Sequence, residues 1–263
     1  MDQGIKEAAQ LRPEKFSEAE WQLRLELAAC YRLVDWFGWT ELVFNHITAR
    51  VPGLAENDKQ FLINPFGLHY GEVTASNLVR INLDGDVLDG SPYPVNRAGF
   101  VIHSAIHAAR DDAHCVLHTH TTAGMAVSCK AGGLRNDNFY SVMLDNKIAY
   151  HDFEGTVTDL EEQPRLVANL GRKNLLILRN HGLLAIGRNI PQMFISYWTL
   201  ERACQIQMAA DSMAGPGQPV TQAVVEATPL RGKQANRPTN EDGTSSIFGA
   251  MLRKAGIRYD ELV

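Results

Sequence analysis

Apolar side chains recur at helical spacing in several stretches of the chain. The first stretch follows Ser17-Glu-Ala-Glu20, which has the form of a capping box, and Gly38 is a suitable residue to end it. Between these points Leu23, Leu27 and Val34 share one helical face. The same reasoning predicts further helices after Asn96, over 121–130, over 161–170 and over 191–213.

Short apolar runs between these helices predict β-strands. They cover 45–50, 60–64, 79–83, 86–88, 115–120, 147–150, 174–178 and 183–186. Asp84-Gly85 separates two of them and is a typical dipeptide of a type I′ hairpin turn. Because helices and strands alternate irregularly and include a hairpin, the sequence predicts an α/β domain with a mixed sheet covered by helices.

The character of the sequence changes toward both ends. Residues 1–16 are expected to form an N-terminal tail, and 17–213 the folded domain. Residues 214–246 are rich in Gly, Pro, Thr, Asn and Gln with little periodicity, which predicts a linker. Residues 247–263 begin with an apolar stretch and are predicted to be a C-terminal docking segment, with a neighbouring subunit as one candidate surface.

The overall composition is that of an ordinary globular protein. Of 263 residues, 45% are apolar and 21% are charged, and the net charge is −5. This charge gives no general reason to bind nucleic acid or an anionic membrane, and no apolar run is long enough for a membrane span. The first residues lack the apolar stretch of a signal peptide, so a cytoplasmic protein is expected. The four cysteines form no C-x-x-C pair, and no disulfide framework is expected.

Three histidines carry the strongest chemical signal. His118 and His120 flank one residue at the end of an apolar run, and His181 lies in Asn180-His-Gly182. In a strand, the two-residue period puts the first two rings on one face, about 7 Å apart at Cβ. Such imidazoles can converge on one cation at about 2.0–2.1 Å. We therefore predict a divalent-metal site whose three ligands leave coordination positions open for catalysis.

The other histidines are interpreted more simply. A lone histidine beside a strand is often a hydrogen-bonded core or turn residue, which is also the alternative for each of the three above. His103 and His107 lie four residues apart on one helical face but lack the glutamate of a metalloprotease helix, so we interpret them as packing residues or supports of the metal site. No pattern distinguishes His46, His69, His114 and His151.

Six short motifs, in their order along the chain, resemble the class II aldolase/adducin family. They are Asn45-His-Ile-Thr48, Asn64-Pro-Phe-Gly67, Asn96-Arg-Ala-Gly-Phe100, His103-Ser-Ala-Ile-His107, His118-Thr-His120 and Arg179-Asn-His-Gly-Leu183. The resemblance covers roughly 20–215 and is closer to the adducin-head branch than to the sugar-phosphate aldolases. It implies a three-layer α/β/α fold with a central mixed, largely antiparallel sheet.

The resemblance also implies a cofactor and partners. Enzymes of the family are typically homotetramers with active sites at subunit interfaces, and they act on small-molecule substrates. His118, His120 and His181 match the family's three metal-binding histidines. The metal is usually Zn²⁺, although imidazole ligands also suit Mn²⁺, Fe²⁺ and Co²⁺.

The chain departs from the sugar-phosphate aldolases at their acid/base glutamate. Gly99 occupies that position, and Asn96 and Arg97 stand where paired serines help hold substrate phosphate. Standard fuculose-phosphate or ribulose-phosphate chemistry is therefore disfavoured. Asn96 and Arg97 are instead candidate substrate-binding residues, because the planar guanidinium can bind a carboxylate or a phosphate. A solvated arginine at a helix start is the alternative.

Four further residues match substrate-side groups of the family loosely. Tyr140 and Tyr259 correspond to tyrosines that family aldolases supply as proton donors from the neighbouring subunit and the C-terminal tail. A packed or surface tyrosine is the alternative for each. Asn45 matches a residue that helps hold substrate phosphate, with a turn-capping role as its alternative, and Gly67 matches the adjoining loop.

Two hypotheses from different classes follow. In the first, the protein is a metal-dependent carbon–carbon lyase that performs aldol-type cleavage or decarboxylation of a small oxygenated carbonyl or carboxylate compound through a metal-stabilised enolate. The missing carboxylate penalises aldol cleavage more, because loss of CO₂ generates the carbanion without a base. In the second, the protein is a non-catalytic adducin-like module that assembles with itself or binds partners. A sugar-phosphate epimerase is a further alternative that needs acid/base groups the sequence does not identify.

Overall fold

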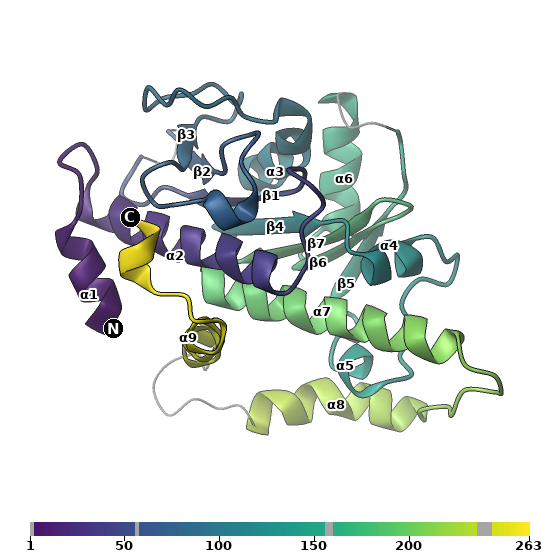
Figure 1. The fold of residues 1–263 in the computed structure, drawn as a ribbon. Coiled ribbons are helices and arrows are strands. Elements are labelled where there is room, and N and C mark those ends of the chain that lie inside the picture. The colour runs from purple at the N-terminus through teal and green to yellow at the C-terminus, as the bar shows by residue number, and fades with distance from the viewer. Residues whose placement is uncertain (1–2, 56–57, 156–159, 236–243) are drawn as a thin grey trace.

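A seven-stranded mixed sheet forms the centre of the computed structural model, which describes residues 3–55, 58–155, 160–235 and 244–263 (Figure 1). In the spatial order β3-β2-β1-β4-β7-β6-β5, the strands are Val79–Ile81, Phe61–Ile63, His46–Arg50, Cys115–Thr119, Gly182–Gly187, Leu175–Leu178 and Ile148–His151. Neighbouring strands are antiparallel except β5 and β6, which are parallel. The predicted mixed, largely antiparallel sheet is therefore confirmed.

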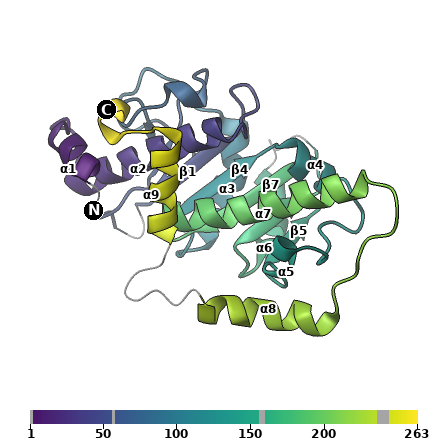
Figure 2. The same ribbon diagram turned by 60° about the horizontal axis from the view of Figure 1, so that its bottom comes forward.

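Helices cover both faces of the sheet, which confirms the three layers (Figures 1 and 2). On one face, α3 (Arg97–Ala109) and α6 (Gln163–Leu170) pack on apolar side chains of the central strands, including Val116. On the other face, α2 (Glu18–Trp36) and α7 (Ile190–Asp211) bury the alternating set, including Leu117. The shorter or peripheral elements are α1 (Gln3–Gln10), α4 (Thr122–Ser128), α5 (Phe139–Val142), α8 (Gln222–Ala235), α9 (Thr244–Ala255), η1 (Tyr70–Glu72), η2 (Leu160–Glu162) and η3 (Tyr259–Leu262).

Helix α2 begins and ends near the predicted residues, but its cap is only half of a capping box. Ser17 Oγ accepts from the Glu20 amide at 3.1 Å, and Gly38 follows the helix with φ +68°. The Glu20 side chain instead accepts from Arg24, one turn further along the helix, at 2.8 Å. The predicted reciprocal cap is therefore replaced by a buried ion pair.

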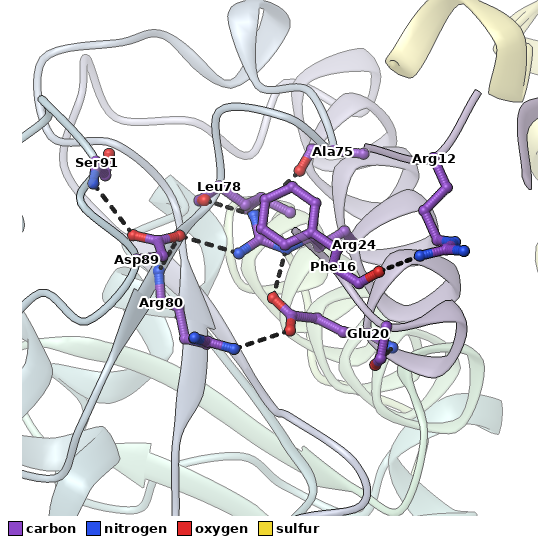
Figure 3. Close-up of polar contacts among 10 residues, drawn as sticks. Arg12, Phe16, Glu20, Arg24, Ala75, Leu78, Arg80, Asp89 and Ser91 are labelled. Carbon is purple, nitrogen blue, oxygen red and sulfur yellow. Dashed lines mark hydrogen bonds and ion pairs between the residues drawn. The ribbon is translucent and has the colours of Figure 1, made fainter. Parts of the chain in front are cut away.

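Arg24 is the centre of a buried network of charges between α2 and the outer edge of the sheet (Figure 3). Its fully buried guanidinium donates to Glu20 at 2.8 Å and to Asp89 at 3.0 Å. Arg80 of β3 donates to the second Glu20 oxygen at 3.0 Å, so two cations face two carboxylates. Such pairing is what makes a buried charge tolerable.

Neutral groups complete the surroundings of Arg24. It donates to the main-chain oxygens of Ala75 and Leu78 at 3.2 and 2.7 Å. The Phe16 ring stacks on it, with the guanidinium carbon 3.8 Å from the ring centre. One side chain thus fastens the segment before α2, the loop before β3 and the loop around Asp89 to a single helix.

The predicted hairpin after β3 forms only in part. The second strand is reduced to one antiparallel bridge between Ile81 and Val87. A type I′ turn needs positive φ at both central residues, but Gly85 has φ +79° and Asp84 is not in the left-handed region. The type I′ assignment is therefore wrong. The Asn82 side chain accepts from the amides of Asp84 and Asp86 and holds the loop in another conformation.

The segments outside 17–213 contain more helix than expected. Helix α1 lies in the expected N-terminal tail, and α8 lies in the expected linker, where it packs against α5. The C-terminal segment docks on its own chain: α9 contacts α7 and α2, and η3 contacts α1 and α2. Figure 2 shows α9 crossing the end of α7. The domain boundaries themselves stay predictions. None of the described helices combines the length and apolar character that a bilayer span requires.

Candidate metal centre

The strand directions bring the three predicted histidines to one edge of the sheet. Strands β4 and β6 both pair antiparallel with β7, so they run in the same direction and end at the same edge. His118 lies at the end of β4, and His120 follows it. His181 occupies the tight turn from β6 to β7, after Asn180 in the left-handed region (φ +56°). Residues far apart in the sequence thus meet at one point.

The three imidazoles form a compact triangle. The ring centres of His118, His120 and His181 are 4.7 to 4.8 Å apart. One nitrogen from each ring lies within 4.8 Å of the others, and Nε2 of His118 is 2.9 Å from Nε2 of His120. Ligands of a tetrahedral zinc ion are about 3.3 Å apart, so small ring shifts suffice for coordination.

Burial keeps these rings neutral. It lowers the pKa of His118 well below the usual value, and that of His181 to about 4, with the neighbouring rings adding to the effect. Burial also lowers the pKa of His120, opposed by the charge of Glu41. A neutral ring offers a lone pair. His118 Nδ1 lies 2.9 Å from the Leu183 carbonyl, so Nδ1 carries the hydrogen and Nε2 is left as the donor atom for a metal.

Gly182 permits the close approach of the two backbone segments. A Cβ at this position would lie 2.6 Å from the Thr119 main-chain oxygen, 3.1 Å from His120 Cδ2 and 3.2 Å from His118 Cε1. The first of these atoms is backbone and cannot move aside alone. The glycine of the Asn-His-Gly turn is therefore required by space, and not by an unusual φ.

We expect Gly182→Ala to lower the free energy of unfolding by about 1–3 kcal/mol and to weaken divalent-metal binding, because β7 must move away from β4 at the histidines. Gly132→Ala is a matched control, since a Cβ at Gly132 meets no atom within 4 Å. Denaturant unfolding and metal titration of both variants check the prediction. Equal metal affinity in the wild type and Gly182→Ala would contradict it.

His46 joins this cluster, although its sequence context showed no pattern. The register of β1 and β4 pairs His46 directly with His118, and their ring centres are 6.0 Å apart. The His46 ring also lies 4.1 Å from that of His103 on α3. The sequence suggests no role for His46 beyond packing. In the structure, its ring lies between His118 of the three-histidine triangle and His103 of the covering helix α3.

Behind His46, a chain of hydrogen bonds determines which ring nitrogens carry hydrogen. His107 Nδ1 lies 2.8 Å from the Ala113 carbonyl, so it donates there and its Nε2 accepts from Thr48 Oγ1 at 2.7 Å. Thr48 Oγ1 then accepts from His103 Nδ1 at 2.7 Å. His103 Nε2 is left with a lone pair and no hydrogen-bond partner among the described residues. The interpretation of His103 and His107 as supports of the site agrees with this arrangement.

Tyr31 joins the loops on which the predicted substrate-binding residues lie. Its hydroxyl accepts from the amides of Ile47 and Asn64 at 2.8 and 3.1 Å and lies 2.5 Å from the Ile47 carbonyl. It therefore ties the start of β1 to the loop that leads to Gly67, which has φ +99°. Burial raises the pKa of Tyr31, so the hydroxyl stays protonated.

The remaining substrate-binding candidates lie just before β1 and at the start of α3. Asn45 precedes β1 with φ +69°, and its buried Oδ1 and Nδ2 have no hydrogen-bond partner among the described residues. Asn96 precedes α3, and its carbonyl accepts from the Phe100 amide at 3.2 Å. Arg97 is the first residue of α3, but its side chain lies outside the described part of the structure.

The two tyrosines predicted as proton donors lie on other parts of the chain. Tyr140 belongs to α5, which packs against α7 and α8, and its ring contacts Trp198 at 5.4 Å between centres. Tyr259 is buried in η3 against α1 and α2. Within one subunit, neither is brought into the histidine triangle.

Comparison with known proteins relates these features to a family. Residues 25–208 match the family model described as Class II Aldolase and Adducin N-terminal domain. A Caulobacter vibrioides protein provisionally named an aldolase class 2 protein is 50% identical over 199 residues, which are 76% of each chain. Alpha-adducin of Rattus norvegicus is 47% identical over 203 residues, which are 76% of this chain and 27% of the adducin.

A solved structure extends the similarity to the whole fold. The L-fuculose 1-phosphate aldolase from Glaciozyma antarctica PI12 superposes with a TM-score of 0.76. The two proteins are 29% identical, and the match covers 96% of this chain and 98% of the other. The sheet and its covering helices are thus shared with an enzyme.

Proposed function

The chain belongs to the class II aldolase and adducin family, and on this premise we propose that it is a divalent-metal-dependent carbon–carbon lyase. The observation that carries the proposal is the convergence of His118, His120 and His181, three neutral imidazoles with nitrogens within 4.8 Å of one another. A module that only assembles has no need for three lone pairs directed at one point.

The three histidines are suited to hold a transition-metal ion and to leave part of its coordination sphere open. We propose zinc, with Mn²⁺, Fe²⁺ and Co²⁺ as alternatives that imidazole also binds. When bound, such an ion polarises a carbonyl and stabilises negative charge that develops beside it. His118 is oriented for this role by the Leu183 carbonyl.

Polar side chains beside the histidines would bind and orient the substrate. Asn45 offers a buried amide with both polar atoms available, and such a group is stabilised when a ligand completes its hydrogen bonds. The loops that carry Gly67 and Asn96 are joined where the Phe66 amide donates to the Pro94 carbonyl at 2.9 Å. Arg97 follows at the start of α3. We propose these residues as the binding site for a small oxygenated carbonyl or carboxylate compound.

Two reactions fit this arrangement: aldol-type cleavage and decarboxylation. Gly99 supplies no carboxylate to α3 where sugar-phosphate aldolases carry one. Decarboxylation does not require that base, whereas aldol cleavage needs another group to accept the hydroxyl proton. The similarity to an L-fuculose 1-phosphate aldolase supports the aldol reaction.

A homo-oligomer, with the tetramer as the expected form, would complete the site. Phe153 lies exposed beside the histidines: its ring centre is 6.3 Å from that of His181, and the residue is 54% exposed. Leu42, in the turn before β1, is a second large apolar residue at the surface and is 73% exposed. A neighbouring subunit could cover them and supply Tyr140 as proton donor, whereas Tyr259 would first have to leave its packing against α1 and α2 of its own chain. A cytoplasmic location remains a prediction from the sequence.

A non-catalytic module is the second candidate, and the similarity to alpha-adducin favours it. In that case self-assembly or partner binding would be the function, and the histidines would be retained without catalysis. A sugar-phosphate epimerase is less well supported, because no pair of acid/base groups flanks the described histidines.

The test is metal reconstitution followed by a substrate panel. Metal-free protein is supplied with Zn²⁺, Mn²⁺, Fe²⁺ or Co²⁺, the bound metal is counted, and aldol compounds and β-keto carboxylates are assayed. We expect one ion per chain and metal-dependent cleavage of at least one class. His118→Ala should lose both, whereas His114→Ala, on an exposed residue just before the same strand, should keep both. If the wild-type protein acquires no divalent ion on reconstitution, the proposal is wrong.

A further inference from the structure

The residues that alternate with the metal-site histidines point to the opposite face of the sheet and bond to one helix. Thr119 Oγ1 forms a hydrogen bond with the Tyr197 hydroxyl of α7. Thr121 Oγ1 donates to Glu201 Oε2, one turn further along α7, at 2.5 Å. The segment from His118 to Thr121 is therefore placed between the metal site on one side and α7 on the other.

The side chains that form these contacts are buried, and those of Glu201 and Thr121 have further hydrogen-bond partners. Thr119, Tyr197 and Glu201 are all buried polar residues, and the second Glu201 oxygen accepts from Gln205 at 3.1 Å. Thr121 also accepts from the Gly124 amide at 3.2 Å, which starts α4. Buried polar groups of this kind restrict a backbone to one position, because any movement leaves a polar atom without a partner.

We propose that Tyr197 and Glu201 are positioning residues of the metal centre, which hold the His118-Thr-His120 segment in place through Thr119 and Thr121. Neither side chain belongs to the group of three histidines that could hold the metal. The inference rests on the metal site proposed above and adds its supporting shell on α7. Its physical basis is that ligand orientation, set by groups behind the ligands, typically changes metal affinity by about 10- to 100-fold.

Burial raises the pKa of Glu201, while its hydrogen bonds from Thr121 and Gln205 lower it. Burial also raises the pKa of Tyr197. The tyrosine hydroxyl therefore keeps its hydrogen, and the pair with Thr119 is a bond between neutral hydroxyls. Tyr197 and Glu201 thus anchor the two threonines together, because Tyr197 interacts with Thr119 and also with Thr121, which donates to Glu201.

The test measures metal binding directly, so it needs no substrate. Thr119→Val, Thr121→Val, Tyr197→Phe and Glu201→Leu each remove one partner at nearly constant size. We expect each to weaken Co²⁺ and Zn²⁺ binding by about 10- to 100-fold in competition with a chromophoric chelator, and to change the Co²⁺ ligand-field spectrum. Thr121→Ser keeps the hydroxyl and is expected to restore both readouts.

Gln207→Leu is the matched control. Gln207 is equally buried on α7, but its side chain donates to the Gly133 carbonyl at 3.0 Å and accepts from the Arg135 amide at 2.8 Å, away from the histidine strand. It should reduce stability while leaving metal affinity and the Co²⁺ spectrum unchanged. Wild-type affinity in the four variants, or an equal loss in Gln207→Leu, would overturn the inference and leave the proposed lyase intact. Failure of the wild type to bind either ion would overturn both.

Discussion

Replacing Arg24 with alanine is expected to lower the free energy of unfolding by about 3–5 kcal/mol. The substitution removes the guanidinium but leaves Glu20 and Asp89 buried, with side chains only 3% and 7% exposed. It also leaves the Ala75 and Leu78 carbonyls without this donor. Two buried carboxylates then share one cation, Arg80, which still contacts Glu20. The buried charge left without a partner costs far more than the ion pair contributes, which is why one residue has so large an effect.

Guanidinium chloride unfolding, followed by circular dichroism, measures this change. Arg258→Ala provides the comparison, because Arg258 forms its ion pair with Asp260 at the surface, where solvent screens the charges and the pair contributes little to stability. Arg24→Lys should fall between the two, since an ammonium cannot reproduce the forked contacts. An Arg24→Ala variant within 1 kcal/mol of the wild type would show that the network does not hold α2 to the sheet.

Acidification is expected to unfold the metal-free protein steeply below about pH 6.5. Burial lowers the pKa of His107 to about 3 and that of His103 well below its usual value, with neighbouring histidines adding to the effect at His103. Below pH 6.5 the unfolded chain takes up protons at these rings, and the folded chain does not. Stability from each ring is complete above the unfolded pKa and is lost as the pH falls toward the folded pKa.

Each such histidine contributes a slope of about 1.4 kcal/mol per pH unit, so the two together contribute roughly 3 kcal/mol per pH unit. Urea unfolding of metal-free protein at several pH values between 7.5 and about 5 measures the slope. His107→Gln should lower it by about half of that amount, because it removes one of the two rings. A slope that is unaffected by His107→Gln would contradict the assignment of a neutral buried ring.

The elements that could be predicted from the sequence are those whose signal is local. Helix α2 has its cap at Ser17 and a regular apolar face, and β6 is a continuous apolar run. The sequence does not predict helix α8, because its apolar positions do not repeat around one face and because it packs at the margin of the domain, against α5. The type I′ prediction at Asp84-Gly85 is wrong because the Asn82 side chain stabilises another loop conformation.

The residues of the candidate site also differ in whether a local sequence pattern identifies them. His118, His120 and His181 could be identified from their spacing and from the turn around the third. His46 could not, because its place depends on the register between β1 and β4. Tyr197 likewise lies far along the sequence from Thr119, with which it forms a hydrogen bond, and no local sequence pattern connects the two residues.

The turn from β6 to β7 brings His181 to His118 and His120 only when β7 has paired with β4. Partly folded chains that contain β4 alone would hold two of the rings and would bind a cation weakly. Uptake of the proposed metal ion would therefore report completion of the central sheet, and during refolding it should lag behind the appearance of helices. A metal ion that binds only the completed sheet would also slow the unfolding of that sheet. Removal of the ion would therefore shorten the lifetime of the folded chain.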